Sequence, residues 1–423
     1  MENNRVVITG MGVIAPNGHG LTEYEASLRQ GKSGIRFHPK LEQLKFACQV
    51  GGIPQNVEQI KAKYFSQQDL LAMSESMIYA GIAGMDCWQD AGLNSKTADG
   101  DPDWDTGAII GTGIGGMDVM GEKLIPKVDA GNVRRLGSTI VEQVMCSSVS
   151  AKLGGLLGLG GQVTTNSSAC TTGTEAIVDA FLKVKEGKLK RVMAGGAEGS
   201  SPYIWAGFDG MKVLNSKFND RPEQASRPMS ASAAGFIPGS GAGLLMLESL
   251  DSAKSRNARI YAEIIGGHIN SGGQRGGGSM TAPNPEGVVR CIRQAVLMAG
   301  ISPRDINAIN GHLTATFADP HEIKNWLRAL EISAKSFPLI NSTKSMIGHA
   351  LGAAGGLECV AAVLQLYHGF IHGSLNCQDL HPELAHVKDS IVQQTRDFTG
   401  EIMAKSSFGF GDVNGCLIFK KWK

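Results

Sequence analysis

The segment VTTNSSACTTGTEAIVDAFLKV (Val163–Val184) carries the clearest structural signal in this 423-residue sequence. Its pattern predicts a short strand, a loop of small polar residues and then a helix. A second segment, LINSTKSMIGHALGAAGGLECVAAVLQL (Leu339–Leu366), repeats this order and ends in a helix rich in Gly and Ala. Strand–loop–helix units of this kind are typical of α/β proteins with a substantially parallel sheet. The recurrence predicts two related halves.

Apolar runs elsewhere in the chain fit the same fold class. We predict strands at Arg5–Gly10, Thr106–Gly111 and Arg191–Gly195, and a long helix at Leu70–Ala91. The polar stretch Asp251–Asn257 precedes another strand candidate at Arg259–Ile265 and is the preferred boundary between the halves. The chain is therefore divided into residues 1–250 and residues 251–423.

Composition excludes several classes of protein. With 40 Lys and Arg against 39 Asp and Glu, the formal charge is +1, which gives no support for nucleic-acid binding. No stretch approaches the roughly 18 apolar residues that a membrane helix needs, and the N-terminus lacks a signal-peptide pattern. The eight cysteines include no C-x-x-C pair, which disfavours a zinc ribbon or a redox motif. We expect a cytoplasmic protein that binds neither membrane nor nucleic acid.

Cys170 lies where the predicted strand of the first segment gives way to its helix. A thiol at a helix start experiences the positive end of the helix dipole and faces unpaired N–H groups. Both effects favour the thiolate, so we expect a lowered pKa and the highest reactivity of the eight thiols. The alternative for a single cysteine is a buried side chain that acts as a small hydrophobe.

Two histidines in comparable positions favour the catalytic interpretation. His312 lies in the small-residue loop NGHLTAT after a strand candidate, and His349 follows Lys344 in KSMIGH. One cysteine and two histidines at element ends fit nucleophilic catalysis at the carboxyl edge of a parallel sheet. Neither histidine belongs to an H-x-x-x-H pair on a predicted helix, which disfavours a metal site.

Alternating Phe and Gly residues near the C-terminus, SSFGFGDVN (Ser406–Asn414), form a further motif. Phe408 and Phe410 fit core aromatics, which is the usual fate of Phe. The glycines between them favour a different interpretation, in which the loop is a mobile lid over an apolar tunnel.

Together these motifs resemble those of the condensing enzymes of the thiolase superfamily, specifically the elongating β-ketoacyl-[acyl-carrier-protein] synthases. The resemblance covers nearly the whole chain, from VVITGMGVIAPNG through GTGIGG, SSACTTG, AGGAE and NSTKSMIGHALGAAG to SFGFGDVNG. It implies a five-layered α-β-α-β-α fold made of two duplicated halves. It also implies a dimer that works with an acyl carrier protein, needs no cofactor, and condenses a Cys-bound acyl chain with malonyl-carrier protein.

The resemblance also assigns roles to individual residues. It makes Cys170 the acyl-accepting nucleophile, His312 and His349 its catalytic partners, and Lys344 the lysine that supports the histidines. The backbone N–H groups of Cys170 and Phe410 would form the oxyanion hole. The remaining assignments are Thr314 and Thr316 for the phosphopantetheine arm, Ile114 and Phe408 for substrate binding and gating, and Asp319 and Glu322 for support.

The sequence departs from the family pattern at a few positions. Leu313 replaces a glycine after His312, and one residue is missing before Asp319, although Asp319 and Glu322 keep the D-x-x-E spacing. Ser240 stands where an acid is common, and Asp412 replaces a glycine of the gate loop. These departures allow a specialised pathway, such as polyene or polyketide assembly, in place of housekeeping fatty-acid synthesis.

Three alternative functions fit the sequence less well than an elongating synthase. A priming synthase would pair Cys with His and Asn, whereas here the second position is His349. A thiolase would need a second catalytic cysteine, and the only candidate, Cys416, lies beyond the Gly-Phe loop. A non-catalytic, tunnel-shaping subunit of a ketosynthase/chain-length-factor heterodimer would lose its nucleophile, whereas Cys170 is present. A heterodimer in which this chain is the active subunit stays open beside a homodimer.

Overall fold

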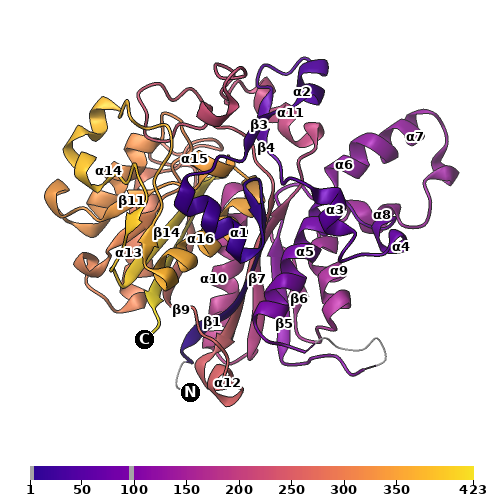
Figure 1. Ribbon diagram of the computed structural model, residues 1–423, viewed down its shortest axis with the longest axis horizontal. Helices are drawn as coiled ribbons and strands as arrows, with labels where there is room; N and C mark the ends of the chain where they lie inside the picture. The colour runs from indigo at the N-terminus through magenta and orange to yellow at the C-terminus, as the bar shows by residue number, and fades with distance from the viewer. Residues whose placement is uncertain (1–3, 95–99) are drawn as a thin grey trace.

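The computed structural model describes residues 4–94 and 100–423 and shows one large mixed sheet with helices packed on and between its parts (Figure 1). The strands on the main path of the sheet, in spatial order, are β11 (Leu339–Asn341), β10 (Ala308–Asn310), β14 (Ile402–Gly409), β15 (Val413–Lys421), β9 (Ala262–Ser271), β1 (Val6–Ala15), β8 (Gly241–Ser249), β7 (Arg191–Glu198), β5 (Thr106–Gly111) and β6 (Val163–Thr164).

The two halves of this sheet have the same topology. Numbered in chain order within each half, the strands run 3-2-4-5-1 from either outer edge to the middle. In both halves the second strand is parallel to the third and fourth, while the fifth is antiparallel to both of its neighbours. The duplicated architecture expected from the two strand–loop–helix segments is therefore present in the fold.

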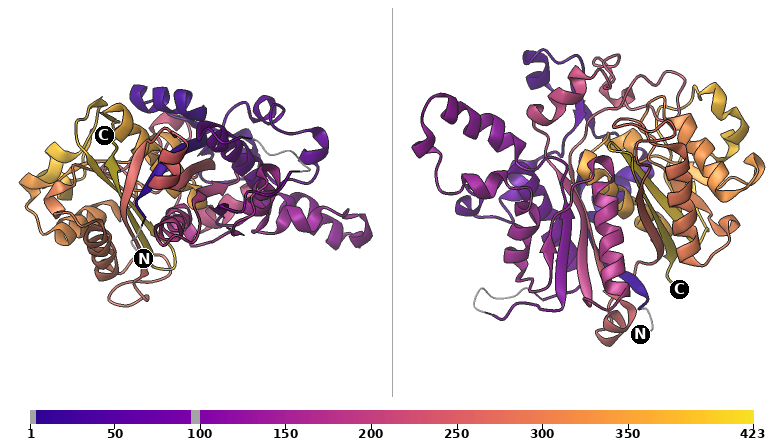
Figure 2. Two further views of the ribbon diagram at one scale, coloured as in Figure 1. Left: turned by 90° about the horizontal axis from the view of Figure 1, so that it is seen from below. Right: turned by 180° about the vertical axis from the view of Figure 1, so that it is seen from behind.

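Helices add three layers to the two sheet halves (Figure 2). One outer layer is α5 (Glu75–Asp90) with α9 (Ser148–Leu157), and the other is α13 (Pro285–Ala299) with α14 (Asp319–Leu330). Between the halves lie α10 (Thr172–Lys185) and α16 (Ala354–His368), which touch each other and strands of both halves. The layers follow the order α-β-α-β-α.

Glycines of the two central helices allow these helices to pack closely against each other. A Cβ at Gly173 would lie 2.7 Å from the backbone N of Gly356, and one at Gly355 would lie 2.3 Å from the backbone N of Thr174. Real Cβ atoms do not approach that closely, so larger side chains would force the helices apart. Small residues let α10 and α16 meet backbone to backbone, which brings their N-terminal ends together.

Most of the predicted strands and helices are present in the structure, but two predictions are wrong in part. The sheet is mixed and not substantially parallel, because β8 and β15 run against their neighbours; β15 follows β14 through a tight turn that allows only antiparallel pairing. The long helix predicted at Leu70–Ala91 begins only at Glu75, with Ser74 as N-cap residue, and a separate short helix covers Gln67–Leu70.

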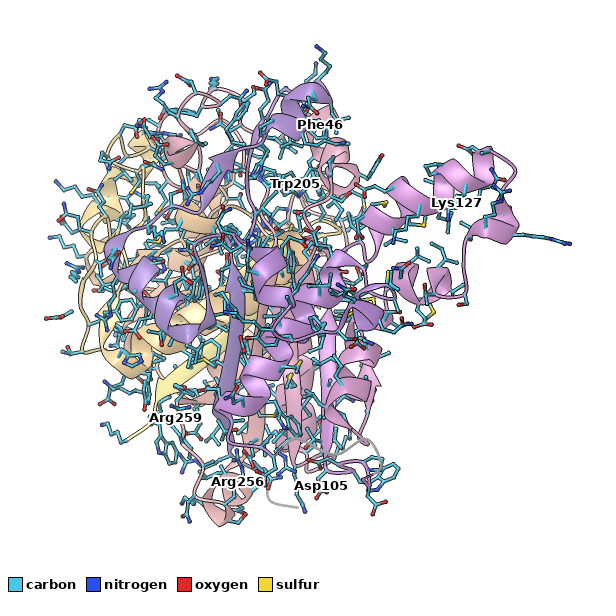
Figure 3. All side chains as sticks on the ribbon, turned by 45° about the vertical axis from the view of Figure 1, so that its right-hand side comes forward. Phe46, Asp105, Lys127, Trp205, Arg256 and Arg259 are labelled. Carbon is cyan, nitrogen blue, oxygen red and sulfur yellow. The ribbon has the colours of Figure 1, made fainter. Side chains whose placement is uncertain are left out.

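Charged side chains line the base of the molecule, where the chain passes between the halves (Figure 3). Arg256 pairs with the buried Glu248 at 2.6 Å, and Arg259 forms an ion pair with Asp90. Arg256 follows the short helix α12 (Leu250–Ser255). Among residues 4–94 and 100–423, no helix combines the length and the apolar character needed to cross a membrane.

Candidate active site

The predicted site residues gather at the carboxyl ends of the parallel strands. β10 ends two residues before His312, β11 ends three residues before Lys344, and β14 ends one residue before Phe410. The chain after β6 leads to Cys170. The Sγ atom of Cys170 and one ring nitrogen each of His312 and His349 lie within 4.8 Å of one another, and all three residues are buried. The expected Cys-His-His cluster is formed.

Cys170 sits on a strained turn immediately before the central helix. It belongs to a single 3₁₀ turn (Ala169–Thr171), and Ala169 has a φ of 50°, a left-handed conformation that L-residues seldom adopt. A Cβ at Gly409 of β14 would lie 3.1 Å from the Cys170 backbone N and 2.9 Å from Oγ1 of Thr171. The nucleophile turn therefore packs directly against the Gly-Phe loop, and position 409 has no room for a side chain.

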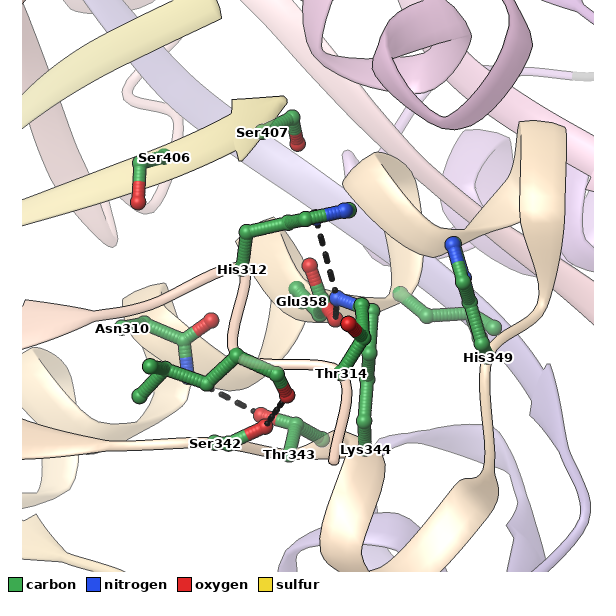
Figure 4. A network of polar contacts seen from close by, with 12 residues as sticks. Asn310, His312, Thr314, Ser342, Thr343, Lys344, His349, Glu358, Ser406 and Ser407 are labelled. Atoms are coloured by element: carbon green, nitrogen blue, oxygen red, sulfur yellow. Dashed lines mark hydrogen bonds and ion pairs between the residues drawn. The ribbon is translucent and has the colours of Figure 1, made fainter. Parts of the chain in front are cut away.

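The hydrogen bonds to the two imidazoles fix their tautomers. Nζ of Lys344 lies 3.4 Å from Nδ1 of His312 (Figure 4), and an ammonium group can only donate. The backbone N–H of Leu351 donates to Nδ1 of His349 over 3.3 Å. Because both Nδ1 atoms accept, each neutral ring carries its proton on Nε2. The site thus presents two Nε2–H donors.

Both histidines are held in the neutral form. Burial lowers the pKa of His312 and His349 well below the usual value, and the nearby positive charge of Lys344 lowers both further. The rings meet edge to face, with centroids 5.3 Å apart. At neutral pH the pair therefore acts as uncharged hydrogen-bond donors.

The thiol of Cys170 does not have the lowered pKa predicted from its helix-start position. Burial raises its pKa to about 11, and the positive charge of Lys344 and a hydrogen bond from the backbone N–H of Phe410 only partly oppose this effect. The helix dipole and the N–H groups can be inferred from the sequence, whereas the loss of hydration that raises the pKa depends on how the turn is packed. A buried thiol of this kind is poorly ionised until a substrate or a proton acceptor enters.

A buried network of charged side chains lies next to the two histidines. Lys344 forms an ion pair with Glu358 of α16, and Lys405 of β14 approaches the second oxygen of the same carboxylate at 2.7 Å. The sequence analysis predicted Lys344 and missed Glu358 and Lys405. A signal was present in the sequence, because Glu358 is the one charge in the apolar run LGAAGGLECVAAVLQL and Lys405 is the one charge in the strand-like run IMAKSSFGF.

Asp319 and Glu322 hold the backbone of the His312 loop and do not reach the cluster of reactive atoms. The Glu322 carboxylate accepts the N–H groups of His312 and Leu313 at 2.7 and 2.8 Å. Asp319 accepts those of Thr314 and Ala315 at 2.8 and 3.1 Å. Four successive N–H groups are thus fixed by two carboxylates at the start of α14.

The remaining predicted residues surround the cluster. The hydroxyl oxygens of Thr314 and Thr316 lie 3.0 Å apart and are half-buried on the His312 loop. Phe408 packs against His312 with ring centroids 6.2 Å apart, and Phe410 lies beyond the end of β14 against Phe208. Ile114 is half-buried, and its N–H donates to the buried carboxylate of Glu198 over 3.4 Å.

Two further features of the site were not predicted from the sequence. Phe236 packs edge to face against His349, with centroids 5.2 Å apart, and Phe208 links Phe236 to Phe410. Glu198 at the end of β7 accepts N–H groups from Gly113 and Gly352 at 2.8 and 3.0 Å, tying the GTGIGG loop to the turn after His349. Burial raises the pKa of Glu198 to about 7.

The cluster is poorly suited to a metal ion, although cysteine and histidine are common metal ligands. Nδ1 of His312 faces an ammonium group, and Nδ1 of His349 is occupied by an N–H. A divalent cation would add to the buried positive charge of Lys344 and Lys405. The surroundings instead favour a group that develops negative charge.

The sequence matches the N-terminal domain of β-ketoacyl synthases over residues 3–253 and their C-terminal domain over residues 261–378. It is 35% identical to 3-oxoacyl-[acyl-carrier-protein] synthase 1 of Escherichia coli (strain K12), with 99% of each chain covered. The chain belongs to the β-ketoacyl synthase family. The acyltransferase class and the family predicted from the motifs are confirmed.

Solved structures of the family share the whole fold. The ishigamide ketosynthase/chain length factor superposes with a TM-score of 0.89 at 28% identity and covers 100% of both chains. A beta-ketoacyl synthase from Burkholderia phymatum STM815 gives a TM-score of 0.91 at 28% identity, covering 99% of this chain and 100% of its own. These matches confirm the thiolase-like fold class.

Proposed function

We propose that this β-ketoacyl synthase extends an acyl chain by two carbons through decarboxylative condensation with malonyl-acyl-carrier protein. The observation that carries the proposal is the cluster of Cys170, His312 and His349, in which two neutral rings aim Nε2–H donors from a site that disfavours cations. No metal or nucleotide is needed, because each negative charge that develops in the reaction has a hydrogen-bond donor among the residues of the chain.

In the first half-reaction the sulfur of Cys170 attacks the thioester carbonyl of the acyl-carrier protein. The tetrahedral oxyanion accepts hydrogen bonds from the backbone N–H groups of Cys170 and Phe410, an arrangement whose single donors contribute about 3–4 kcal/mol in related sites. The thiol of the phosphopantetheine arm leaves and takes the proton lost by Cys170. Thr314 and Thr316 hold that arm.

In the second half-reaction malonyl-carrier protein replaces the free carrier and loses CO₂. The electron pair of the broken C–C bond becomes an enolate, whose thioester oxygen accepts the Nε2–H groups of His312 and His349. The enolate carbon attacks the acyl carbonyl on Cys170, and the sulfur leaves as the thiolate and takes a proton from solvent. The product is a β-ketoacyl chain on the carrier.

We further propose that the active form is a dimer, homomeric or paired with a chain-length partner, and that it works with an acyl carrier protein. We place the domain boundary between residues 250 and 251, close to residue 253, where the match to the N-terminal domain ends. The eight cysteines are free, as in a reducing compartment such as the cytoplasm. Ile114 and Phe408 line the acyl pocket in this proposal.

The acylation half-reaction is tested by mapping the covalent adduct. Cys146 is exposed whereas Cys170 is buried, so a small electrophile will also label Cys146. The acyl group of an octanoyl-carrier protein should appear by peptide mass spectrometry on Cys170 alone, in the wild type and in Cys146→Ser. Acylation that disappears in Cys146→Ser and persists in Cys170→Ala would overturn the assignment.

A further inference from the structure

Lys405 is a fully buried lysine that the mechanism above does not use. It lies on β14, three residues before Phe408, and its Nζ contacts the Glu358 carboxylate at 2.7 Å and Oγ of Ser407 at 2.8 Å. Ser407 in turn lies 2.7 Å from Oγ1 of Thr174 on the helix that begins behind Cys170. Figure 4 shows Ser407 and Glu358 around the two histidines.

The arrangement is unusual because Glu358 is already paired with Lys344. A second buried ammonium on the same carboxylate is costly, since each ion loses its hydration and only one negative charge faces two positive ones. Lys405 therefore leaves the group Lys344–Glu358–Lys405 with a net charge of +1. That charge lies next to the site where the proposed enolate forms.

The charges that face this group come from several elements. Glu322 of α14 is linked to it through Ser406, whose hydroxyl donates to the Glu322 carboxylate at 3.0 Å. His312, His349 and Cys170 lie on the active-site side. The thiols of Cys359 on α16 and Cys416 on β15 lie within its electrostatic reach and are buried. Glu322 is engaged by the N–H groups of the His312 loop.

We propose that Lys405 is a positioning residue for the condensation proposed above: it holds Glu358 between two ammonium groups and adds a second positive charge, beside that of Lys344, that opposes protonation of His312 and His349. One carboxylate oxygen lies 2.7 Å from the Lys405 ammonium and the other pairs with Lys344, whose Nζ lies 3.4 Å from Nδ1 of His312. The net positive charge then opposes a further proton on either ring.

The chemical consequence concerns the fate of the enolate. A neutral ring donates a hydrogen bond to the enolate oxygen and is too weak an acid to protonate the carbanion readily. An imidazolium is a much stronger acid, and transfer of its proton to the enolate carbon gives acetyl-carrier protein without a new C–C bond. Lys405 thereby favours condensation over unproductive decarboxylation, and its effect is largest at acid pH.

The test replaces the charge and leaves the volume, in Lys405→Met, with Lys405→Gln in parallel as a neutral side chain that still donates to Ser407. The pH dependence of condensation and the ratio of acetyl-carrier to β-ketoacyl-carrier product are measured from pH 5.5 to 8.5. Ser407→Ala, which removes a hydrogen bond of Lys405 but keeps its charge, is the matched control for structural loss.

We expect both neutral variants to move the acid limb of the pH–rate profile for condensation upward by about one pH unit, the usual effect of one nearby charge, and to release more acetyl-carrier protein at the acid end of the range. Ser407→Ala should leave the acid limb of the pH–rate profile unchanged. A rate loss that is uniform over pH, or a limb that moves equally in Ser407→Ala, would overturn the role of the charge.

Histidine ¹³C NMR titration of the wild type and Lys405→Met separates this proposal from the proposed function, because it needs no turnover. The ring signals of His312 and His349, assigned with single-histidine variants, should titrate at higher pH in Lys405→Met. Unchanged titration would overturn the role of Lys405 even if condensation is observed. Absence of condensation in the wild type with shifted titration would instead overturn the function alone.

Discussion

Replacement of Asp412 by glycine should loosen the loop of residues 272–284, which is hydrogen-bonded to the turn after Phe410. Asp412 lies in the three-residue turn between β14 and β15, is fully buried and has a φ of 63°. Its carboxylate accepts the backbone N–H groups of Gln274 and Asn284 at 2.9 and 2.8 Å. This chain carries an acid where the family pattern has glycine, and the two hydrogen bonds hold that acid in place.

The magnitude follows from these contacts. Each hydrogen bond to a charged group contributes about 1.5–3 kcal/mol, so losing both costs about 3 kcal/mol at the lower end. Relief of the left-handed backbone returns about 1 kcal/mol, because glycine adopts this conformation without penalty. The loop should therefore open more easily by about 2 kcal/mol, which is roughly a 30-fold larger open population.

Hydrogen exchange measures that population directly. The amides of Gln274 and Asn284 should exchange about 30-fold faster in Asp412→Gly, with helix α13 as the internal reference that does not change. Asp412→Asn tolerates a positive φ but lacks the charge, so faster exchange in both variants assigns the effect to the carboxylate. Exchange at Gln274 and Asn284 that is the same as in the wild type would refute the reasoning. Wider acceptance of acyl chains is the expected functional consequence.

His312→Ala and His349→Ala should each slow condensation by at least about 100-fold, the usual cost of losing a donor to a developing oxyanion. Acylation of Cys170, measured by intact-protein mass spectrometry, should fall much less. Full condensation activity in either variant would contradict the role of the two histidines as paired donors. Alkylation of Cys170 by a neutral electrophile should accelerate with rising pH toward about pH 11, because burial raises the thiol pKa and the thiolate reacts; a plateau near pH 7 would contradict this. Glu358→Gln should lower the free energy of unfolding by about 3–5 kcal/mol, since it leaves two buried ammonium groups unpaired; an unchanged midpoint in urea would argue against the shared carboxylate.

The sequence predicted those features that depend on local pattern. The strand–loop–helix segments around Cys170 and His349 were recognisable because small residues and apolar periodicity recur within a short stretch. Asp319 and Glu322 were recognisable by their spacing at a helix start. The position of a residue at the end of a strand sufficed to bring Cys170, His312 and His349 together, because parallel strands share one carboxyl edge.

Features that depend on burial and on distant contacts were not accessible in this way. The thiol pKa of Cys170 was predicted with the wrong sign, because the balance between helix dipole and lost hydration depends on how deeply the turn is packed. Lys405 and Glu358 are 47 residues apart, so their pairing requires the fold. The antiparallel direction of β8 was likewise invisible, since a fully buried strand reads the same in either direction.

The most direct test of the proposed condensation follows the carbons of malonyl-carrier protein. The protein is incubated with octanoyl-carrier protein and with malonyl-carrier protein labelled with ¹³C at its free carboxyl or at its central carbon, and the carriers are weighed by intact-protein mass spectrometry. The proposed reaction predicts a 3-oxodecanoyl-carrier that keeps the central label and loses the carboxyl label as CO₂. A carrier that stays octanoylated, or an extended product that retains the carboxyl label, would contradict it.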